Sequence, residues 1–403
     1  MSQPLVTIVT PSYNQAHFIQ ATIESVLSQD YPHVEYIVMD GGSTDNTAEV
    51  VRPYAESKKL TFISEKDRGQ SHAINKGFRM ARGSIVAWLN SDDLYLPGAI
   101  SAAVKGFKEQ PLTGAVYGEG FQIDRDGAVK SKFPFTEPFN LWNLTYALDY
   151  VLQQTVFFRR EALEQVGWVD ESLHFGMDWD VLVKLAQRFG LHYLPVEMGA
   201  LREYDDAKSF AGGAKRFTEL ANLIRRQTGQ RFAPAYIFYG LDTYEKIWCP
   251  QVQRLIPGPL GAWASRRLSH LCRHYIDRAY YFSQGLYRDG WASDPMHYMI
   301  PEGHGKVLFR GENVRLNHRF DDQILRVTAG GLELGRIRPG IGPFSVEFPA
   351  PLHLQGKCLT LEVLASRSAI PSRISTSPDS RRLAFRFLEL RWTEQVATHI
   401  MAR

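Results

Sequence analysis

Short apolar runs alternate with longer amphipathic segments between residues 6 and 89. The apolar runs predict buried strands, because they are rich in β-branched and aromatic residues and end at polar turns. The segments between them have the spacing of helices that cover a sheet. We predict strands at 6–9, 35–39, 60–64 and 84–89, with helices at 18–28, 46–55 and 71–81. This alternation is typical of an α/β fold with a largely parallel sheet.

The pattern changes twice farther along the chain. From 219 to 298 it predicts mainly helices that are rich in aromatic residues and Arg. After Pro301, short alternating segments separated by Gly, Pro and Asp predict a small β-sandwich. We therefore expect an α/β domain at 1–225, a helical region at 226–300 and a β-sandwich accessory domain at 301–403.

Two adjacent carboxylates, Asp92 and Asp93, follow the predicted strand at 84–89. Ligands of α/β proteins bind at the carboxyl ends of the strands. Carboxylate oxygens there suit Mg²⁺ or Mn²⁺, and these ions commonly accompany phosphate. The alternative is that one of the two residues caps the helix after Pro97. Polar turns also end the three earlier strands, which favours a ligand site at this edge.

Composition excludes several classes of protein. A chain of 403 residues suggests two or three domains, and 44% hydrophobic with 22% charged residues indicates a folded protein. The net charge of +3 is too small to indicate nucleic-acid binding, and we expect none. The charge is uneven, because residues 251–403 hold 21 Lys or Arg against 13 Asp or Glu.

The cysteines, the first residues and the length of the apolar runs indicate the cellular compartment of the protein. All three cysteines lie beyond residue 248, in no metal-ligand spacing, which favours a reducing compartment over a disulfide framework. No secretory signal opens the sequence, and no apolar run reaches the ~18 residues that span a bilayer. We expect a cytoplasmic protein.

Four ordered motifs resemble those of inverting family 2 glycosyltransferases, which have a GT-A fold. They are Thr10-Pro11-Ser12-Tyr13-Asn14, residues 40–47 (DGGSTDNT), residues 67–77 (DRGQSHAINKG) and Asn90-Ser91-Asp92-Asp93. The resemblance covers roughly residues 4–210. It implies transfer of a sugar, with inversion, from a UDP, GDP or dTDP donor to a hydroxyl of a glycan or lipid-linked oligosaccharide in bacterial surface-polysaccharide synthesis.

The resemblance also implies roles for particular residues. A Mn²⁺ or Mg²⁺ ion would be held by Asp93 first and Asp92 second, because Asn90 stands where the family has the first acid of its metal motif. Asp178 matches the family's general base, although Met177 replaces the Glu that precedes it and the segment alone also suits a helix amino terminus. The nucleotide would be bound by Pro11, Tyr13, Asp40, Asp67, His72, Asn75 and Asp92. The diphosphate and acceptor would be bound by Arg202, Lys208, Gln154 and Trp179.

Several of these assignments have structural alternatives. Tyr13 could belong to the core and Asn75 to a helix surface, whereas Arg202 and Lys208 could lie in a surface loop. Tyr204 replaces a His that relatives have near the diphosphate. Asn90 and Met177 support an alternative function, a catalytically degenerate carbohydrate-binding protein. A glycoside hydrolase is disfavoured, because its two carboxylates must be opposed rather than adjacent.

Two interpretations of the basic helices in the last part of the chain are open. The arginines between 266 and 288, interleaved with aromatic residues, form either a surface on anionic lipid at the inner face of the cell membrane or a helix packed on the catalytic domain. The β-sandwich would bind glycan, form a homo-oligomer or only pack against its neighbours.

Overall fold

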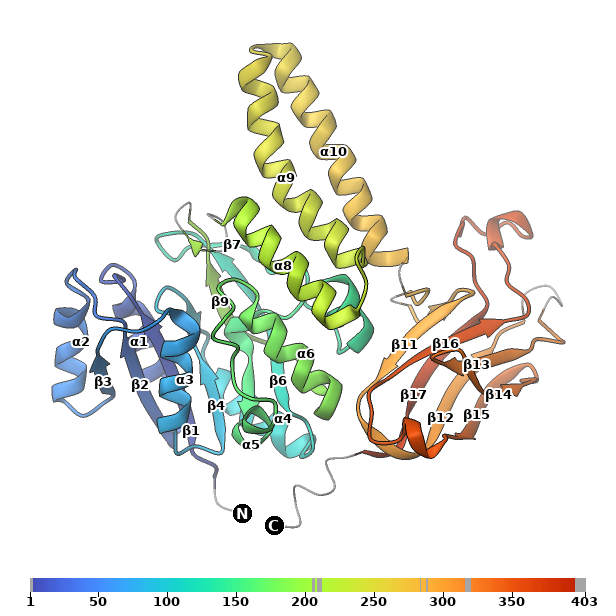
Figure 1. Ribbon diagram of the computed structural model, residues 1–403, viewed down its shortest axis with the longest axis horizontal. Helices are drawn as coiled ribbons and strands as arrows, with labels where there is room; N and C mark the ends of the chain where they lie inside the picture. The colour runs from blue at the N-terminus through green and yellow to red at the C-terminus, as the bar shows by residue number, and fades with distance from the viewer. Residues whose placement is uncertain are drawn as a thin grey trace. The chain divides into compact units, whose positions relative to one another are not determined.

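The computed structural model describes residues 3–204, 207–208, 212–282, 284–287, 289–315 and 320–395 (Figure 1). The chain forms two compact units. The first unit comprises Met1–Phe139, Asp149–Ala186 and Gly190–Gln227. The second unit comprises Asn140–Leu148, Gln187–Phe189 and Thr228–Arg403, so the helical and β regions fall in one unit.

A mixed sheet forms the centre of the first unit, with the order β3-β2-β1-β4-β8-β6-β9-β5, and β7 paired to β6. Strands β1, β2, β3 and β4 are parallel, as the apolar runs predicted, and β6 is parallel to β9. Strands β8, β5 and β7 are antiparallel to their neighbours. The strands are β1 (Val6–Ser12), β2 (Val34–Asp40), β3 (Thr61–Ser64), β4 (Ile85–Trp88), β5 (Leu94–Tyr95), β6 (Ala115–Ile123), β7 (Val129–Lys132), β8 (Phe157–Arg159) and β9 (Leu191–Arg202).

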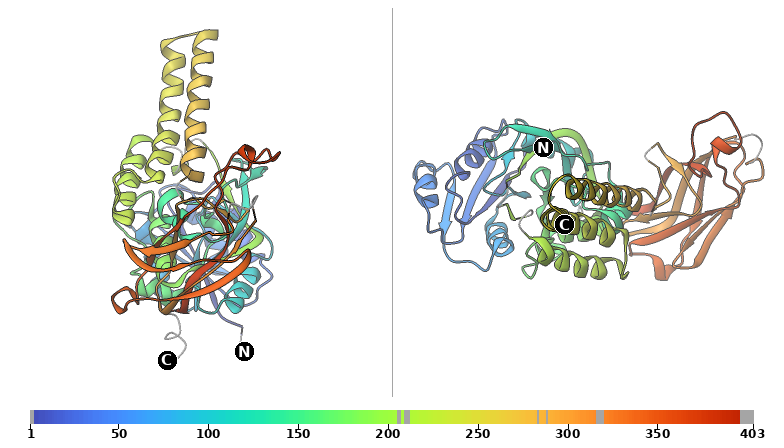
Figure 2. Two further views of the ribbon diagram at one scale, coloured as in Figure 1. Left: turned by 90° about the vertical axis from the view of Figure 1, so that its right-hand side faces the viewer. Right: turned by 90° about the horizontal axis from the view of Figure 1, so that it is seen from above.

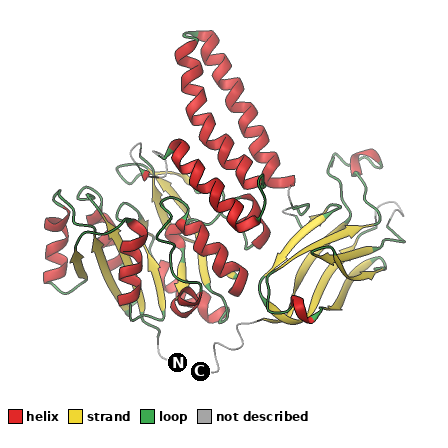
Figure 3. Ribbon diagram, in the orientation of Figure 1, coloured by secondary structure: helices red, strands yellow, loops and turns green. Residues whose placement is uncertain are grey.

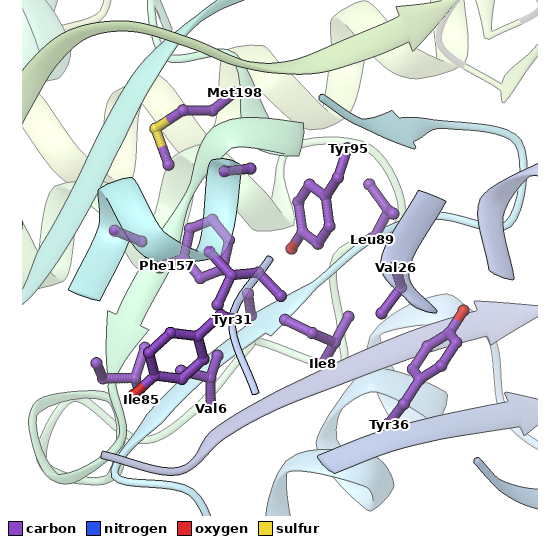
Figure 4. Close-up of a cluster of buried hydrophobic side chains, with 14 of the residues drawn as sticks. Val6, Ile8, Val26, Tyr31, Tyr36, Ile85, Leu89, Tyr95, Phe157 and Met198 are labelled. Carbon is purple, nitrogen blue, oxygen red and sulfur yellow. The ribbon is translucent and has the colours of Figure 1, made fainter. Parts of the chain in front are cut away.

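Helices cover both faces of this sheet (Figure 3). Successive strand residues point to opposite faces, so β4 shows which helix lies on which side. Ile85 belongs to the cluster that includes residues of α1 and α4 (Figure 4). Trp88 instead stacks on Phe158 at 5.2 Å and meets Phe78 of α3 edge-on. The helices and short turns are α1 (Ile19–Leu27), α2 (Thr47–Glu56), α3 (Gln70–Met80), α4 (Ala99–Glu109), η2 (Gln153–Thr155), α5 (Arg160–Gln165), α6 (Met177–Phe189) and α8 (Gly213–Thr228), whereas η1 (Asn143–Ala147) belongs to the second unit.

The second unit contains two long helices and two four-stranded antiparallel sheets. The helices are α9 (Pro234–Leu255) and α10 (Pro259–Phe282). One sheet has the order β10-β17-β12-β15 and the other β11-β16-β13-β14. Their strands are β10 (Trp291–Ala292), β11 (Met296–Ile300), β12 (Gly303–Asn313), β13 (Leu325–Ala329), β14 (Leu332–Ile337), β15 (Gly342–Pro349), β16 (Leu359–Ala365) and β17 (Phe385–Gln395).

One apolar core joins the two sheets. It takes Phe309 and Phe385 from the first sheet and Leu361 and Val327 from the second, and all four side chains are fully buried. Two sheets that share such a core form a β-sandwich.

The predicted helical region ends earlier than expected. The sequence pattern extended it to residue 298, but the described part of α10 ends at Phe282 and residues 296–300 form β11. This segment pairs along its whole length with β16, and its inward residues Met296 and Ile300 are fully buried. The aromatic and Met residues of this segment suit either a helix or a strand, and pairing with β16 makes it a strand. Among the described helices, none is both long and apolar enough to cross a membrane.

Candidate functional site

The turns after β1 and β2 are tied together by their own polar groups. Asn14, in a left-handed conformation with φ of 54°, accepts a hydrogen bond from the Thr44 backbone N–H at 2.9 Å. Its own N–H donates to the Ser43 hydroxyl at 2.8 Å. Tyr13, beside it, is 59% exposed, which excludes the core alternative and leaves its ring accessible to a ligand.

Asp40 is the buried centre of the second turn. One carboxylate oxygen accepts hydrogen bonds from the backbone N–H of Gly42 and Ser43 and from the Ser64 hydroxyl at 2.6 Å. The other accepts the hydroxyl of Ser43. With 1% of its surface exposed, Asp40 fixes the ends of β2 and β3. A direct contact of this carboxylate with a nucleotide stays a prediction.

The loop before α3 lies against this turn. A Cβ added at Gly41 would stand 2.7 Å from Asp67 Oδ2, so a side chain there would displace the Asp67 carboxylate. Asp67 Oδ1 accepts the Gly69 N–H at 2.7 Å, and His72 Nδ1 accepts the Arg68 N–H at 3.2 Å. Asp67 and His72 therefore order the start of α3.

Asn75 is neither on the helix surface nor free for a ligand. It is 2% exposed, and its amide binds the backbone of Val169 in both directions. Its Nδ2 also donates to Glu171 at 3.0 Å. The expected nucleotide contact is therefore corrected, because every amide group of Asn75 holds the 169–171 loop.

The two carboxylates after β4 lie in different environments. Asp93 is 2% exposed and accepts N–H groups from Gln154 at 2.6 Å, Asn90 at 3.0 Å and the Arg202 backbone at 2.9 Å. Burial, together with the Asp92 charge, raises the Asp93 pKa to about 7. Asp92 is only half-buried and accepts the Tyr204 hydroxyl at 2.8 Å. Burial raises the Asp92 pKa as well, and the Tyr204 hydrogen bond opposes that effect.

The hydrogen bonds leave Asp92 more open to an ion than Asp93, whereas the resemblance put Asp93 first. Both oxygens of Asp93 are already occupied by protein N–H groups, whereas Asp92 has a single side-chain donor, Tyr204. No cluster of three His, Cys, Asp or Glu ligands occurs among the residues that the structure describes. One carboxylate still suits Mg²⁺ or Mn²⁺ when substrate phosphate supplies further oxygens. Of the two carboxylates, Asp92 therefore has the oxygen atoms with fewer protein donors.

Arg202 and Gln154 support the acidic turn from inside the protein. The Arg202 guanidinium, 4% exposed, donates to the backbone oxygens of Asp92, Asp124 and Arg125. The Gln154 amide donates to Asp93. The expected contacts of both residues with the diphosphate or acceptor are therefore corrected, because Nε and Nη1 of Arg202 and the amide of Gln154 donate to protein oxygens.

A chain of hydrogen bonds leads from the acidic turn to Lys208. Asn90, bonded to Asp93, accepts a hydrogen bond from Gln70 Nε2 at 2.7 Å. Gln70 Oε1 in turn accepts the Lys208 ammonium at 2.7 Å. Burial lowers the Lys208 pKa, and the negative charges of Asp178 and Glu219 oppose the shift. The sequence motif contained Gln70 but gave no sign that it contacts Lys208, 138 residues farther along the chain.

Asp178 begins α6 and interacts with Lys208. Its Oδ1 accepts the Trp179 N–H at 3.0 Å. Burial raises the Asp178 pKa, while the nearby charges of Lys208 and Arg216 lower it. Asp149 lies close enough that the Asp178 charge, added to burial, raises its pKa as well. Sequence reasoning missed Asp149, because an isolated Asp in a loop has no distinguishing pattern.

Trp179 follows the base candidate but lies in the interior. It is 1% exposed, so its side chain supports α6 from within. The expected contact of Trp179 with the acceptor is therefore corrected. Lys208, from the same predicted group, acts on Asp178 through its side-chain charge.

Helix α8 holds the segment that leads into Asp178. Glu219 Oε1 accepts the backbone N–H groups of His174 at 3.0 Å, Phe175 at 2.6 Å and Gly176 at 3.2 Å. A Cβ at Gly176 would lie 2.7 Å from the side chain of Leu223, so α8 packs directly on this loop.

A second contact from α8 lies on the other side of Asp178. Arg226 pairs with Asp170 at 3.1 Å and with Asp180 at 2.9 Å. Asp180 is 2% exposed and also pairs with Lys184 at 2.6 Å. The loop before Asp178 and the helix after it are thus both fixed to α8.

Comparison with known proteins agrees with the motifs. The family model "Glycosyl transferase family 2" matches residues 7–167. Residues 7–167 therefore form a family 2 glycosyltransferase domain. The matched residues include the turns after β1, β2 and β4, and they end before Asp178 and α8.

The proteins to which this chain is similar are distant from it. Chondroitin synthase of Escherichia coli is 30% identical over 185 residues, which cover 46% of this chain and 27% of that protein. The chain thus matches about a quarter of that relative's length. An uncharacterized glycosyltransferase of Rickettsia prowazekii, RP339, is 24% identical over 302 residues, 68% of this chain and 93% of its own. The crystal structure of S. aureus TarS 1-349 in complex with UDP-GlcNAc is 16% identical, covers 70% of this chain and 93% of its own, and has a TM-score of 0.46.

Proposed function

We propose that this glycosyltransferase is an inverting enzyme. It moves a sugar from a UDP, GDP or dTDP donor to a hydroxyl of a glycan or lipid-linked oligosaccharide in surface-polysaccharide synthesis. The family 2 match and the similarity to a chondroitin synthase support the reaction class.

One structural observation carries the proposal. Hydrogen bonds run from Lys208, which interacts with Asp178, through Gln70 and Asn90 to Asp93. The candidate base and the acidic turn therefore belong to one polar site, although they are far apart in the sequence. A sugar transferase needs both a proton acceptor and stabilisation of a leaving diphosphate within one substrate length.

In this mechanism Asp178 accepts the proton of the acceptor hydroxyl. Burial raises its pKa above the ordinary value, which increases its basicity, while the Lys208 charge opposes this shift and favours the ionised form. Tyr13, exposed at the end of β1, offers a ring face to the nucleotide base. Asp40 and Asp67 shape the loops around that ring.

The donor diphosphate lies at the acidic turn. Asp92 would hold Mn²⁺ or Mg²⁺ there, and the ion would stabilise the charge of the leaving phosphate as a Lewis acid. Tyr204 orients Asp92 by its hydroxyl, and Arg202 fixes the backbone that carries it. Asp93 stabilises the acidic turn through hydrogen bonds from Asn90, Gln154 and Arg202 and does not bind the ion.

Thermal-shift measurements with UDP-, GDP- and dTDP-sugars, with and without Mn²⁺, test donor binding. A donor at about a hundred times its Kd stabilises the fold by about 2.7 kcal/mol. Release of the nucleoside diphosphate in the presence of oligosaccharide acceptors then measures turnover. Failure of every donor to bind or react contradicts the proposal.

The same measurements separate the alternative function. A glycan-binding protein without catalysis would bind oligosaccharide in the thermal-shift assay and release no nucleoside diphosphate with any donor. The alternative rests partly on Met177, which replaces the Glu that the family has before the general base. The Met177 sulfur accepts a hydrogen bond from the Ser71 hydroxyl at 2.7 Å.

A further inference from the structure

Helices α9 and α10 form an antiparallel hairpin within the second unit (Figures 1 and 2). The two helices are joined at the end of the hairpin by Ile256–Gly258, and Gly258 has φ of +86°, which favours glycine. The Cys249 thiol contacts the Ser265 backbone oxygen at 3.6 Å, and the Ser269 hydroxyl donates to Glu245. These contacts fix one helix against the other.

Large apolar side chains are exposed where the two helices meet. We call Leu255, Ile256, Leu260 and Trp263 the hairpin tip. Their exposed fractions are 80%, 41%, 65% and 56%. Single exposed apolar residues are ordinary on protein surfaces. Four within nine residues at one turn concentrate exposed apolar surface, and such concentrations mark interaction sites.

The charge around the hairpin tip has one sign. Residues 246–276 contain five Lys or Arg and no Asp or Glu. Arg254, Arg266 and Arg267 are exposed, and none of them forms an ion pair with the described residues. Arg273 is different, because it pairs with Glu245 at 3.6 Å. Three unpaired cations thus border the apolar patch.

We propose that the hairpin tip docks on an anionic lipid bilayer. Leucine and tryptophan enter the boundary between headgroups and acyl chains, and the arginines bind the lipid phosphates. A second copy of the chain is a poorer occupant. Residues 251–403 carry 21 Lys or Arg against 13 Asp or Glu, so two such regions would repel each other. The proposal does not depend on the transferase reaction, because the hairpin belongs to the second unit.

Vesicle co-sedimentation of the full chain tests the proposal. Vesicles of phosphatidylcholine alone are compared with vesicles that contain about a third phosphatidylglycerol. Each basic residue near an anionic surface contributes about fivefold in affinity. We expect at least about tenfold stronger binding to the anionic vesicles, and we expect about 0.5 M salt to weaken it, because salt screens the charges.

Two sets of substitutions separate the apolar and basic parts. Leu255→Ser, Ile256→Ser, Leu260→Ser and Trp263→Ser together should lower binding by at least about tenfold. Arg254→Gln, Arg266→Gln and Arg267→Gln together should remove most of the preference for anionic lipid. The matched control is Leu332→Ser with Leu352→Ser in the sandwich, where exposed fractions are 42% and 86%, and binding should not change.

Three results would overturn the proposal. One is equal binding to neutral and anionic vesicles. Another is unchanged binding of the tip variant, with circular dichroism showing that it is folded. The third is a wild-type dimer in sedimentation velocity that the tip substitutions convert to a monomer without any change in vesicle binding, which would assign the patch to a second copy.

Discussion

Removal of Glu219 should impair the transferase without preventing it from folding. The Glu219 carboxylate contacts neither Asp178 nor a substrate-binding turn, but it accepts three consecutive backbone N–H groups from His174, Phe175 and Gly176. These residues immediately precede α6, where Asp178 lies. Glu219 is therefore a positioning residue for the proposed base.

The hydrogen bonds set the size of the effect. A hydrogen bond to a charged group contributes about 1.5–3 kcal/mol when it is shielded from water. Glu219 is half-buried, so the three bonds together should stabilise the loop by about 2–3 kcal/mol. A shift of about 1 Å in a reacting group costs on the order of 10²-fold in rate. We expect Glu219→Ala to lower kcat by about 10- to 100-fold and to leave the donor KM within about twofold.

The conservative variant distinguishes positioning from charge. Glu219→Gln retains the Oε1 atom that accepts all three N–H groups, so it should keep kcat within about fivefold of wild type. Glu56→Ala, at the exposed end of α2, is the control for loss of an acidic side chain. Steady-state kinetics at saturating acceptor, with melting temperatures of all variants, give the comparison. An unchanged kcat in Glu219→Ala, or an equal loss in Glu219→Gln, would refute this reasoning.

The other predictions concern the two ends of the polar network. Asp178→Asn should lower kcat by about 10²- to 10⁴-fold while the donor thermal shift is retained, since a general base contributes this much. Lys208→Gln removes a cation that lowers the Asp178 pKa, so the acidic limb of the kcat profile, where the base must lose its proton, should move to higher pH. Asp92→Ala should raise the Mn²⁺ concentration for half-maximal activity by at least about tenfold. Asp93→Ala should instead lower the melting temperature, because it leaves N–H groups of Asn90, Gln154 and Arg202 without their acceptor.

The parallel part of the sheet could be predicted from the sequence, because its central strands are continuous apolar runs. The predicted segments 6–9, 35–39 and 84–89 are confirmed as β1, β2 and β4, all of which are largely buried. Strand β7 was missed, because all four of its residues are exposed and it pairs only along the edge of β6. Strand β11 was assigned to a helix, because its pairing with β16 depends on residues about 60 positions away.

The location of the site was predictable, but the direction of each side chain was not. Polar turns at the ends of parallel strands must meet at one edge, so the motifs gave the right loops. Whether Asn75 or Arg202 faces a ligand or the protein depends on partners such as Val169 and Asp124, which no local pattern identifies. The role of Glu219 could not be predicted for the same reason, since its hydrogen bonds span more than 40 residues.

Asn90 stands where the family 2 metal motif has an acid, and its amide suits the neighbouring carboxylate of Asp93. Asn90 Nδ2 donates to Asp93 and to Gln153, and Asn90 Oδ1 accepts the amide of Gln70. An aspartate at this position could keep the Gln70 contact, but its second oxygen would face the Asp93 carboxylate in a buried site where like charges repel strongly. Asn90 therefore stabilises the turn that carries Asp92. Its presence is weaker support for a catalytically degenerate protein than the sequence alone suggested. A variant with Asn90→Asp should be less stable than wild type above pH 7, where both carboxylates would ionise, and a melting curve at pH 8 compared with pH 5.5 measures this difference.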